Sequence, residues 1–147
     1  MIHFETKLFS ELTIAELYGI LNLRSEVFVV EQNCIYQDVD FKDQKAFHII
    51  GRINNEIVAY SRFFDKGIYF EEASIGRVVV APGFRKLKLG HQLMEYSISS
   101  LKKILGAQKI KISAQAHLEK FYKVHGFIAV GESYLEDDIL HTAMYLN

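Results

Sequence analysis

The chain has 147 residues, 50% of them hydrophobic, with eleven Phe and eight Tyr. This length and composition suit one globular domain with one sizeable core, and they exclude a largely disordered chain. Seventeen basic residues nearly balance eighteen acidic residues, for a formal net charge of −1. The overall charge therefore gives no indication of a nucleic acid or an anionic membrane as partner.

We expect a cytoplasmic protein without a membrane span, because no run of about eighteen apolar residues occurs. The polar residues His3, Glu5 and Lys7 argue against a signal peptide at the start. A single cysteine, Cys34, excludes an internal disulfide, which agrees with a reducing compartment. No Cys/His spacing typical of zinc is present, so no metal is expected. With one proline and no linker, residues 1–147 are predicted to form one domain.

The first part of the chain predicts a strand and then a helix. Residues Ile2 to Leu8 alternate between apolar and polar, which is typical of a strand. Thr13 and Glu16 fit a capping box before a helix from Ile14 to Glu31. A run of β-branched and aromatic residues follows Arg24 to Glu26, so a break in the helix is expected there.

A polar, irregular stretch from Gln32 to Lys45 follows the helix and carries three aspartates. Such a loop is a common place for substrate specificity. An equally weighted interpretation is that the three carboxylates are simply solvated on a surface loop and have no role in specificity. The aspartates are Asp38, Asp40 and Asp43.

The next stretch predicts a hairpin, from Ala46 to Ile53 and from Glu56 to Phe64, around the Asn54-Asn55 turn. After a second turn, the β-branched run Ile75 to Val80 has the length and continuity of a buried strand. Three antiparallel strands therefore lead to the centre of the chain.

Residues 81–105 predict a short basic loop that opens a helix. Pro82 and Gly83 mark a turn, a basic cluster follows, and apolar residues at helical spacing then run to Leu105. A helix N-terminus offers unpaired backbone N–H groups, which favour phosphate together with nearby cations. The alternative is an ordinary strand-to-helix connection whose lysines are merely solvated.

The last part predicts a strand at Lys109 to Ser113, a helix at Ala116 to Val124, and strands at Phe127 to Val130 and His141 to Leu146. A strand-rich first half followed by alternating strands and helices gives a mixed α/β sheet.

The loop from Arg85 to Gly90 resembles the [RQ]xxGx[GA] motif of the GCN5-related N-acetyltransferases (GNAT), with Lys88 in place of the first glycine. Lys88 is expected to have ordinary helical geometry, so that a side chain is tolerated. Four runs together resemble the small ElaA-type branch of that superfamily, in which a lysine in this loop is usual. The runs are Leu23 to Asp40, Ser74 to Val80, Ala114 to Phe127 and Tyr134 to His141.

The resemblance covers almost the whole chain and implies a single-domain GNAT acyl-CoA N-acyltransferase fold, with a mixed central β-sheet flanked by helices. It implies acetyl transfer from acetyl-CoA to a primary amine, a small molecule or a peptide, by direct attack in a ternary complex. A non-catalytic CoA-binding or protein-interaction domain of the same fold is the alternative. The apolar and aromatic content would also suit a homodimer.

The resemblance also implies site residues. Tyr122 matches the general acid of the family, although its helical spacing with Leu118 and His125 would equally suit a core aromatic. Glu72, just before the central strand, is the named candidate for the general base. Residues expected to contact the cofactor are Val78, Val79, Val80, Arg85, Lys86, Leu87, Lys88, Leu89, Gly90, His91 and Gln115.

Other ionisable residues leave alternatives open. Glu31, Asp40, Glu71 or a water could serve as the base instead, and His117 lies near the same loop. Arg77, inside an apolar strand, needs a carboxylate partner, which is either a structural pair or an acidic substrate. Cys34 has no adjacent base in the sequence and is expected to pack or to lie at the surface.

Overall fold

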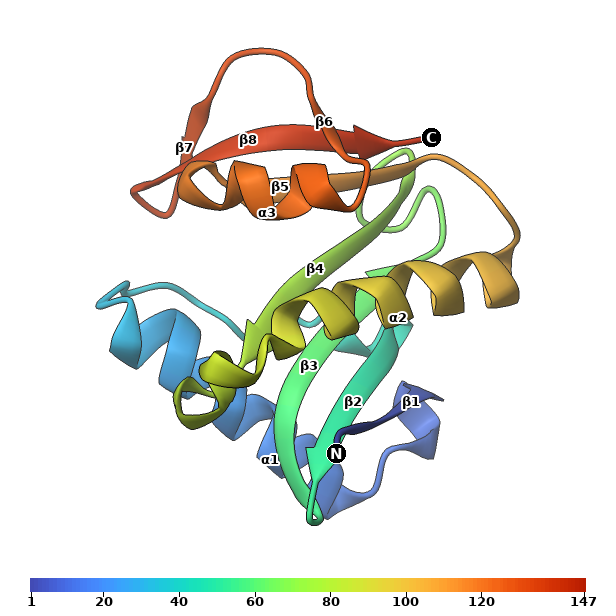
Figure 1. Ribbon diagram of the computed structural model, residues 1–147, viewed down its shortest axis with the longest axis vertical. Helices are drawn as coiled ribbons and strands as arrows, with labels where there is room; N and C mark the ends of the chain where they lie inside the picture. Colours follow the sequence, from blue (N-terminus) through green and yellow to red (C-terminus); the bar gives the residue numbers. More distant parts are fainter.

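The structure, a computed structural model, describes residues 1–147 and contains one eight-stranded mixed sheet (Figure 1). The strand order is β1-β2-β3-β4-β5-β8-β6, and β7 also pairs with β8. The expected mixed α/β sheet is confirmed. The strands are β1 (His3–Leu8), β2 (Phe47–Ile53), β3 (Glu56–Phe64), β4 (Ala73–Val80), β5 (Ile110–Gln115), β6 (Ile128–Ala129), β7 (Tyr134–Glu136) and β8 (Ile139–Leu146).

Helices cover both faces of this sheet. Figure 1 shows α2 and α3 in front of it and α1 behind it. None of the helices is long and apolar enough to cross a membrane. The α-helices are α1 (Ile14–Arg24), α2 (Leu89–Leu105) and α3 (Glu119–Val124), and the short helical turns are η1 (Phe9–Glu11), η2 (Ser25–Glu31), η3 (Asp43–Lys45), η4 (Pro82–Leu87) and η5 (Ala116–Leu118).

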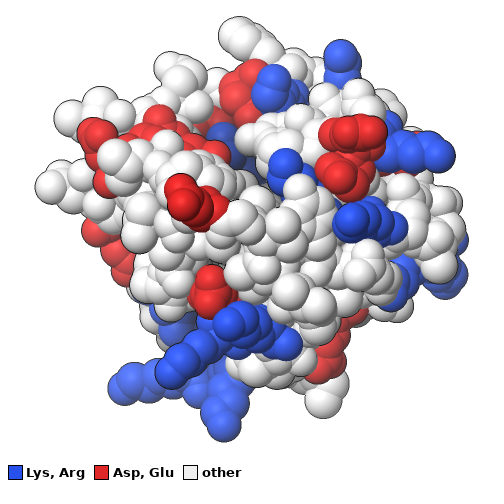
Figure 2. Space-filling model, turned by 90° about the horizontal axis from the view of Figure 1, so that it is seen from above, with Lys and Arg blue, Asp and Glu red and all other residues white.

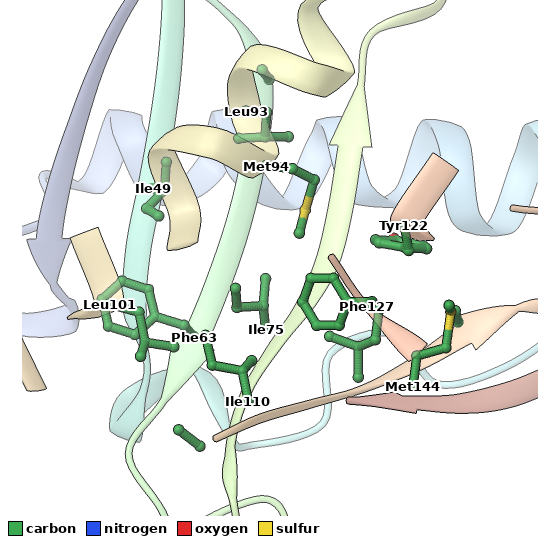
Figure 3. Close-up of a cluster of buried hydrophobic side chains, with 14 residues drawn as sticks. Ile49, Phe63, Ile75, Leu93, Met94, Leu101, Ile110, Tyr122, Phe127 and Met144 are labelled. Carbon is green, nitrogen blue, oxygen red and sulfur yellow. The ribbon is translucent and has the colours of Figure 1, made fainter. Parts of the chain in front are cut away.

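The main core lies between the sheet and the α2–α3 layer. It contains fourteen buried residues, among them Phe63, Leu93 and Phe127, and Tyr122 lies within this cluster (Figure 3). A smaller cluster, which includes Ile20 and Val79, lies under α1 on the opposite face. The two clusters fix β4 from both sides and so position the middle of the sheet.

Two local predictions are confirmed. The Thr13 side chain accepts a hydrogen bond from Glu16 N at 3.0 Å, and Glu16 Oε1 accepts one from Thr13 N at 2.9 Å. This is the expected capping box at the start of α1. Asn54 and Asn55 have φ values of 49° and 68°, so the hairpin between β2 and β3 closes in left-handed geometry.

The predicted break after α1 is wrong. Residues Ser25–Glu31 continue the helix as a π-helix, η2. Cys34 N donates to Val29 O at 3.0 Å, across five residues rather than four. This wider turn leaves more room for β-branched side chains, which crowd the preceding turn of an α-helix. The segment therefore widens where a break was expected.

β4 bends at Arg77. One residue of β3 lies between the partners of Gly76 and Val79, whereas two residues, Arg77 and Val78, lie between them on β4. This is a β-bulge, and Arg77 has a positive φ of 50°. Bulges bend a strand and increase its twist, so β4 turns away from its neighbour beyond this point.

β4 and β5 are the only parallel neighbours, and they separate soon after they meet. They pair only at Ala73 with Ile110 and at Ser74 with Lys111. In Figure 1 they lie together near the starts of both strands and then diverge. The backbone of Ile75–Val80 is therefore left without a strand partner on the β5 side.

Behind the sheet, a buried ion cluster holds the loop that follows η2. Arg24 Nε donates to Asp38 Oδ2 at 3.0 Å, and Arg62 Nη2 donates to Asp40 Oδ2 at 2.6 Å. Asp43 Oδ1 accepts from Arg24 at 2.8 Å and from Arg62 at 2.7 Å. The interpretation of these aspartates as solvated carboxylates is wrong, because the loop turns inward to the guanidinium groups.

Arg77 belongs to the same cluster. Its Nε donates to Asp38 Oδ1 at 2.8 Å and its Nη2 donates to the Asp38 carbonyl at 2.9 Å. The structural carboxylate pair, the first of the two interpretations, is thus confirmed. Because these bonds join the bulge to the loop, they hold the bent part of β4 in place.

β7 was not predicted as a strand. It forms a short hairpin with the start of β8, in which Tyr134 pairs with His141 and Glu136 with Ile139. Asp137 and Asp138, at the turn, have φ values of 50° and 62°. The turn has the same left-handed geometry as Asn54-Asn55, and it places the hairpin beside the gap between β4 and β5.

Candidate functional site

Two cavities meet where β4 leaves β5. The larger, of about 530 Å³, is lined by η2, β4, β5 and the β7–β8 hairpin. The smaller, of about 370 Å³, lies at the start of α2. Both are lined by Val78–Val80, Arg85, Leu118 and Tyr122. Together they form one cleft, which passes through the opening in the sheet.

Lys88 has a left-handed backbone, with φ of 56° and ψ of 31°, between η4 and α2. The expectation of ordinary helical geometry at this residue is wrong. The turn closes through a hydrogen bond from Lys88 N to Arg85 O at 3.3 Å, and the next residue, Leu89, already begins the helix. Glycine adopts this conformation without steric cost, which explains physically why the motif has glycine at this position.

The start of α2 presents unpaired backbone N–H groups. No side chain caps the helix, and the amides of Leu89, Gly90 and His91 belong to its first turn, where an α-helix supplies no i→i−4 acceptor. Lys86 and Lys88 are exposed beside them. Viewed from above, basic side chains gather at the edge where Figure 1 places η4 (Figure 2). The amides, the helix dipole and these cations together favour an anion.

Gly90 lets α2 approach α3 closely. A Cβ atom at this position would lie 3.3 Å from Phe121 Cε1, which is tighter than ordinary van der Waals contact. The requirement for glycine is therefore a matter of space here, since the backbone of Gly90 does not have a positive φ.

Arg85 pairs with Glu31 at the mouth of the cleft. Its Nη1 donates to Oε2 at 2.8 Å and its Nη2 to Oε1 at 2.5 Å. The hydrogen bonds from Arg85 lower the pKa of the Glu31 carboxyl, and the same contacts raise the pKa of Arg85. The two side chains are 45% and 36% exposed, so water weakens the pair and a phosphate could replace the carboxylate.

Tyr122 lies where the two cavities meet. Its residue is only 8% exposed, and its hydroxyl makes no hydrogen bond within the chain. Burial raises the pKa of the phenol to about 12, so the group stays protonated at neutral pH. The ring also packs in the core, which agrees with the alternative interpretation of Tyr122 as a core aromatic, while the hydroxyl faces the cleft.

Of the remaining predicted cofactor residues, two line the cleft, whereas Lys86, Leu87 and Leu89 line neither cavity. Gln115 lines the larger cavity, and its Nε2 donates to Gln32 Oε1 at 3.3 Å. His91 lines the smaller one, with Nδ1 2.9 Å from His125 Nε2. The Leu87 side chain is exposed on η4, whereas Leu89 is 3% exposed and can offer only its backbone.

The structure does not bring Glu72 to the cleft. It precedes the first residue of β4, roughly 20 Å of extended strand away from Val79. Glu71 lies beside it, and Asp40 is engaged by Arg62. Neither Glu72 nor Glu71 lines either cavity. Of the candidates for the base, Glu31 and His117 do line the cleft.

Cys34 also lines the larger cavity, but it is buried, with its Sγ donating to the Asp137 carbonyl at 3.4 Å. Burial raises the pKa of this thiol, which disfavours the nucleophilic thiolate. The expected packing role for Cys34 agrees with this environment.

The segment around Tyr134 to Leu140 was expected from the sequence to line the acceptor pocket, and the β7–β8 hairpin contributes Glu136, Asp137 and His141 to the cleft. His141 is 7% exposed. The alternation of Tyr134 and Glu136 before an Asp-Asp turn is a hairpin signal of the kind used for Asn54-Asn55. It could have indicated that these side chains share one face.

The profile of the family described as "Acetyltransferase (GNAT) domain" matches residues 13–147. Protein ElaA of Escherichia coli is 42% identical over 146 residues, which cover 98% of this chain and 95% of that protein. A UPF0039 protein of Schizosaccharomyces pombe is 38% identical over 147 residues, covering 99% of this chain and 97% of that protein.

Two solved structures are similar over their whole length. An acyl-CoA N-acyltransferase from Pseudomonas aeruginosa superposes with a TM-score of 0.95 at 40% identity, covering 100% of each chain. Escherichia coli ElaA superposes with a TM-score of 0.93 at 41% identity, again covering 100% of each chain. The whole fold described above is therefore shared with solved structures of at least 40% sequence identity.

Proposed function

Because the chain belongs to the GNAT acetyltransferase family, whose fold uses an acyl-CoA cosubstrate, we propose that it transfers an acetyl group from acetyl-CoA to a primary amine. The main observation that supports this proposal is that an unpaired strand edge, an uncapped helix start and a buried phenol all line one cleft. The acceptor is a small molecule or a peptide that carries the amine.

The start of α2 fits the pyrophosphate of coenzyme A. The amides of Leu89, Gly90 and His91 donate to phosphate oxygens, and Lys86 and Lys88 add positive charge beside them. Arg85 exchanges the Glu31 carboxylate for a phosphate, which its planar guanidinium can also bind through two parallel bonds.

The free edge of β4 fits the pantetheine arm. Its peptide groups would pair with the Val78–Val80 backbone in the manner of an added strand, because no strand occupies that side of β4. A backbone N–H in the same segment donates to the thioester oxygen as negative charge develops there. Gln115, on the opposite wall of the gap, is available to the same arm.

Tyr122 acts as the general acid in this proposal. Its hydroxyl is protonated, lacks a partner in the chain and lies beside Val78–Val80 in the cleft. When the amine attacks the carbonyl carbon directly, the carbon–sulfur bond breaks and the phenol gives its proton to the leaving thiolate. Cys34 is not needed as an acetyl carrier, since direct transfer in a ternary complex forms no acyl-enzyme.

Two measurements test the proposal in sequence. Saturable thermal stabilisation by acetyl-CoA, with dephospho-CoA and adenosine as controls, tests the cofactor before any acceptor is assumed. Release of free CoA thiol is then measured with and without a panel of primary amines. Binding with amine-dependent release supports the enzyme. Binding without any amine-dependent release supports the non-catalytic CoA-binding alternative, and absence of binding refutes both.

A further inference from the structure

The two faces of β5 carry different chemistry. Ile110, Ile112 and Ala114 point into the main core, which also contains Tyr122. The alternate residues, Ser113 and Gln115, therefore point to the opposite face. Paired residues of antiparallel strands share a face, so His141, the partner of Gln115, points away from the core and into the larger cavity.

The tautomer of neutral His141 is fixed by its neighbours. Nδ1 lies 2.7 Å from the carbonyl oxygen of Ile139, and a carbonyl oxygen only accepts hydrogen bonds. Nδ1 must therefore carry the proton, which leaves the lone pair on Nε2. Glu136 Oε2 lies 3.5 Å from Nε2, where its negative charge stabilises the imidazolium that forms when Nε2 takes a proton.

His141 lines the same cavity as the predicted oxyanion site. β4 and β5 diverge after Ser74 and Lys111, and the Val78–Val80 segment and Gln115 both line the larger cavity that opens between them. His141 is the next residue across the sheet from Gln115. Tyr122 lines this cavity as well, so the phenol and the imidazole border the same space beside β4.

We infer that His141 is the general base, which takes a proton through Nε2 from the ammonium group of the acceptor. This inference rests on the proposed acetyltransferase function. It replaces Glu72, which lies far from the cleft, and it assigns the acceptor to the α1 side of the sheet, lined by His141, Glu136 and Asp137. An amine that is a cation in solution fits this acidic wall.

The proton and electron balance is complete without another reactant. Nε2 takes one proton from the ammonium, and the freed nitrogen lone pair forms the N–C bond as the C–S bond breaks. The sulfur takes the proton of the Tyr122 hydroxyl. The new amide nitrogen loses its second proton, which returns to the phenolate through solvent, and the imidazolium releases its proton to bulk water. The net products are the amide, free CoA thiol and one proton.

The ionisable groups that surround His141 come from several elements and a turn. β7 contributes Glu136 and Tyr134, whose ring stacks on the imidazole at 6.3 Å. The turn contributes Asp137. The loop after η2 contributes Cys34, whose thiol donates a hydrogen bond to the backbone carbonyl of Asp137. β5 contributes the neutral Ser113 and Gln115 near the imidazole, and Lys111 four residues before Gln115. Glu31, Arg77 and His117 line the same cavity from η2, β4 and η5, and Glu136 is the charged group in direct contact with the imidazole.

The test compares His141→Gln with His3→Gln, a matched change at an exposed histidine on β1. With acetyl-CoA and the best amine of the panel, we expect kcat of His141→Gln to fall by roughly a hundredfold at pH 7. Stabilisation by acetyl-CoA should be unchanged. His3→Gln should match the wild type, and full activity of His141→Gln would overturn the inference.

A purely structural role would lower the rate equally at every pH and for every amine. A base predicts instead that the deficit shrinks as the pH approaches the pKa of the acceptor, because the free amine needs no base. It also predicts a smaller deficit for trifluoroethylamine, which is uncharged at pH 7, than for benzylamine. Equal deficits under all these conditions would overturn the assignment.

Two further measurements keep the inference falsifiable. If His141→Gln does not fold, Glu136→Gln, at a side chain 48% exposed, replaces it. Its kcat at pH 7 should fall severalfold, because the carboxylate beside Nε2 is lost, while stabilisation by acetyl-CoA stays unchanged, and an unchanged kcat would contradict the base. If the wild type binds acetyl-CoA but transfers nothing, the proposed function fails by itself. In that case nitrogen-15 NMR tests His141 independently of activity. The inference requires the neutral ring to carry its proton on Nδ1, so a neutral ring with the proton on Nε2 would refute it.

Discussion

The β1–β4 part of the sheet and the β4–β5 junction satisfy their polar groups in opposite ways. β2 pairs with β3 from Phe47 to Ile53, and the guanidinium groups of Arg24 and Arg62 behind these strands are buried against aspartates, although Arg62 Nε has no partner. β4 and β5 pair at only two positions, and the strand edge, the first amides of α2 and the Tyr122 hydroxyl remain unpaired. The closed region, strands β1–β4 with the ion cluster behind them, stabilises the fold. The open region, the gap between β4 and β5 with the start of α2 and Tyr122, leaves its polar groups free to bind a ligand.

The largest expected effect comes from breaking the closed region at Arg62. Replacement by Ala would leave Asp40 and Asp43 partly buried without this guanidinium. We expect a loss of about 3–5 kcal/mol in the free energy of unfolding, measured by urea titration. Lys66→Ala, at an exposed lysine after β3, is the control and should change stability by less than about 0.5 kcal/mol. A loss below about 1 kcal/mol for Arg62→Ala would contradict the assignment.

Tyr122→Phe changes the open region alone. The ring contacts with Phe121 and Phe127 stay, and the lost hydroxyl has no hydrogen bond in the chain, so stability should change little. The rate of acetyl transfer should fall by roughly a hundredfold, with unchanged acetyl-CoA affinity. Tyr96→Phe, where the ring stacks on Phe4, is the matched control and should retain full activity. An unchanged rate for Tyr122→Phe would remove the general-acid role.

Lys88 tests whether the open region is also strained. Lys88→Gly and Lys88→Ala remove the same charge, but only glycine is relaxed at the observed φ of 56°. The glycine variant should be more stable by about 1 kcal/mol, while both variants should lose similar affinity for coenzyme A. Thermal unfolding and titration with the coenzyme provide the two readouts. Equal stability of the variants would mean that the left-handed geometry costs nothing.

The smallest effect is expected at Glu31. Because Arg85 lowers the pKa of Glu31, the carboxylate stays charged throughout the neutral range and competes there with phosphate for the guanidinium. Glu31→Gln should raise coenzyme affinity severalfold at most, and the gain should shrink at high salt, since the pair is exposed. Glu26→Gln, also exposed on the outer surface of η2, should have no effect. Weaker binding by Glu31→Gln would show that Glu31 supports the loop instead.

Features coded by neighbouring residues were predictable from the sequence. The Thr13–Glu16 capping box, the Asn54-Asn55 turn and the apolar run of the central strand each depend on residues close along the chain. The loop between β4 and α2 was located in the same way. Family resemblance added Tyr122, which lies at the junction of the two cavities.

Features set by tertiary pairing could not be predicted. Nothing in the residues from Ile75 onward indicates that β4 stops pairing with β5, because the bulge at Arg77 depends on the distant Asp38. That Glu72 lies away from the cleft could not be foreseen for the same reason, since adjacency to a strand does not say which end faces the cleft. The position of His141 in the cleft was missed because it depends on the pairing of β8 with Gln115.

The contact between Gly90 and Phe121 has a mechanical consequence. The first turn of α2 and the helix that carries Tyr122 lie so close that a Cβ atom at residue 90 would be 3.3 Å from the Phe121 ring. In a close-packed interior, displacement of one helix is transmitted to the other. Under the proposed function, the helix start that binds the phosphate and the helix that carries the phenol would therefore shift together when either one moves.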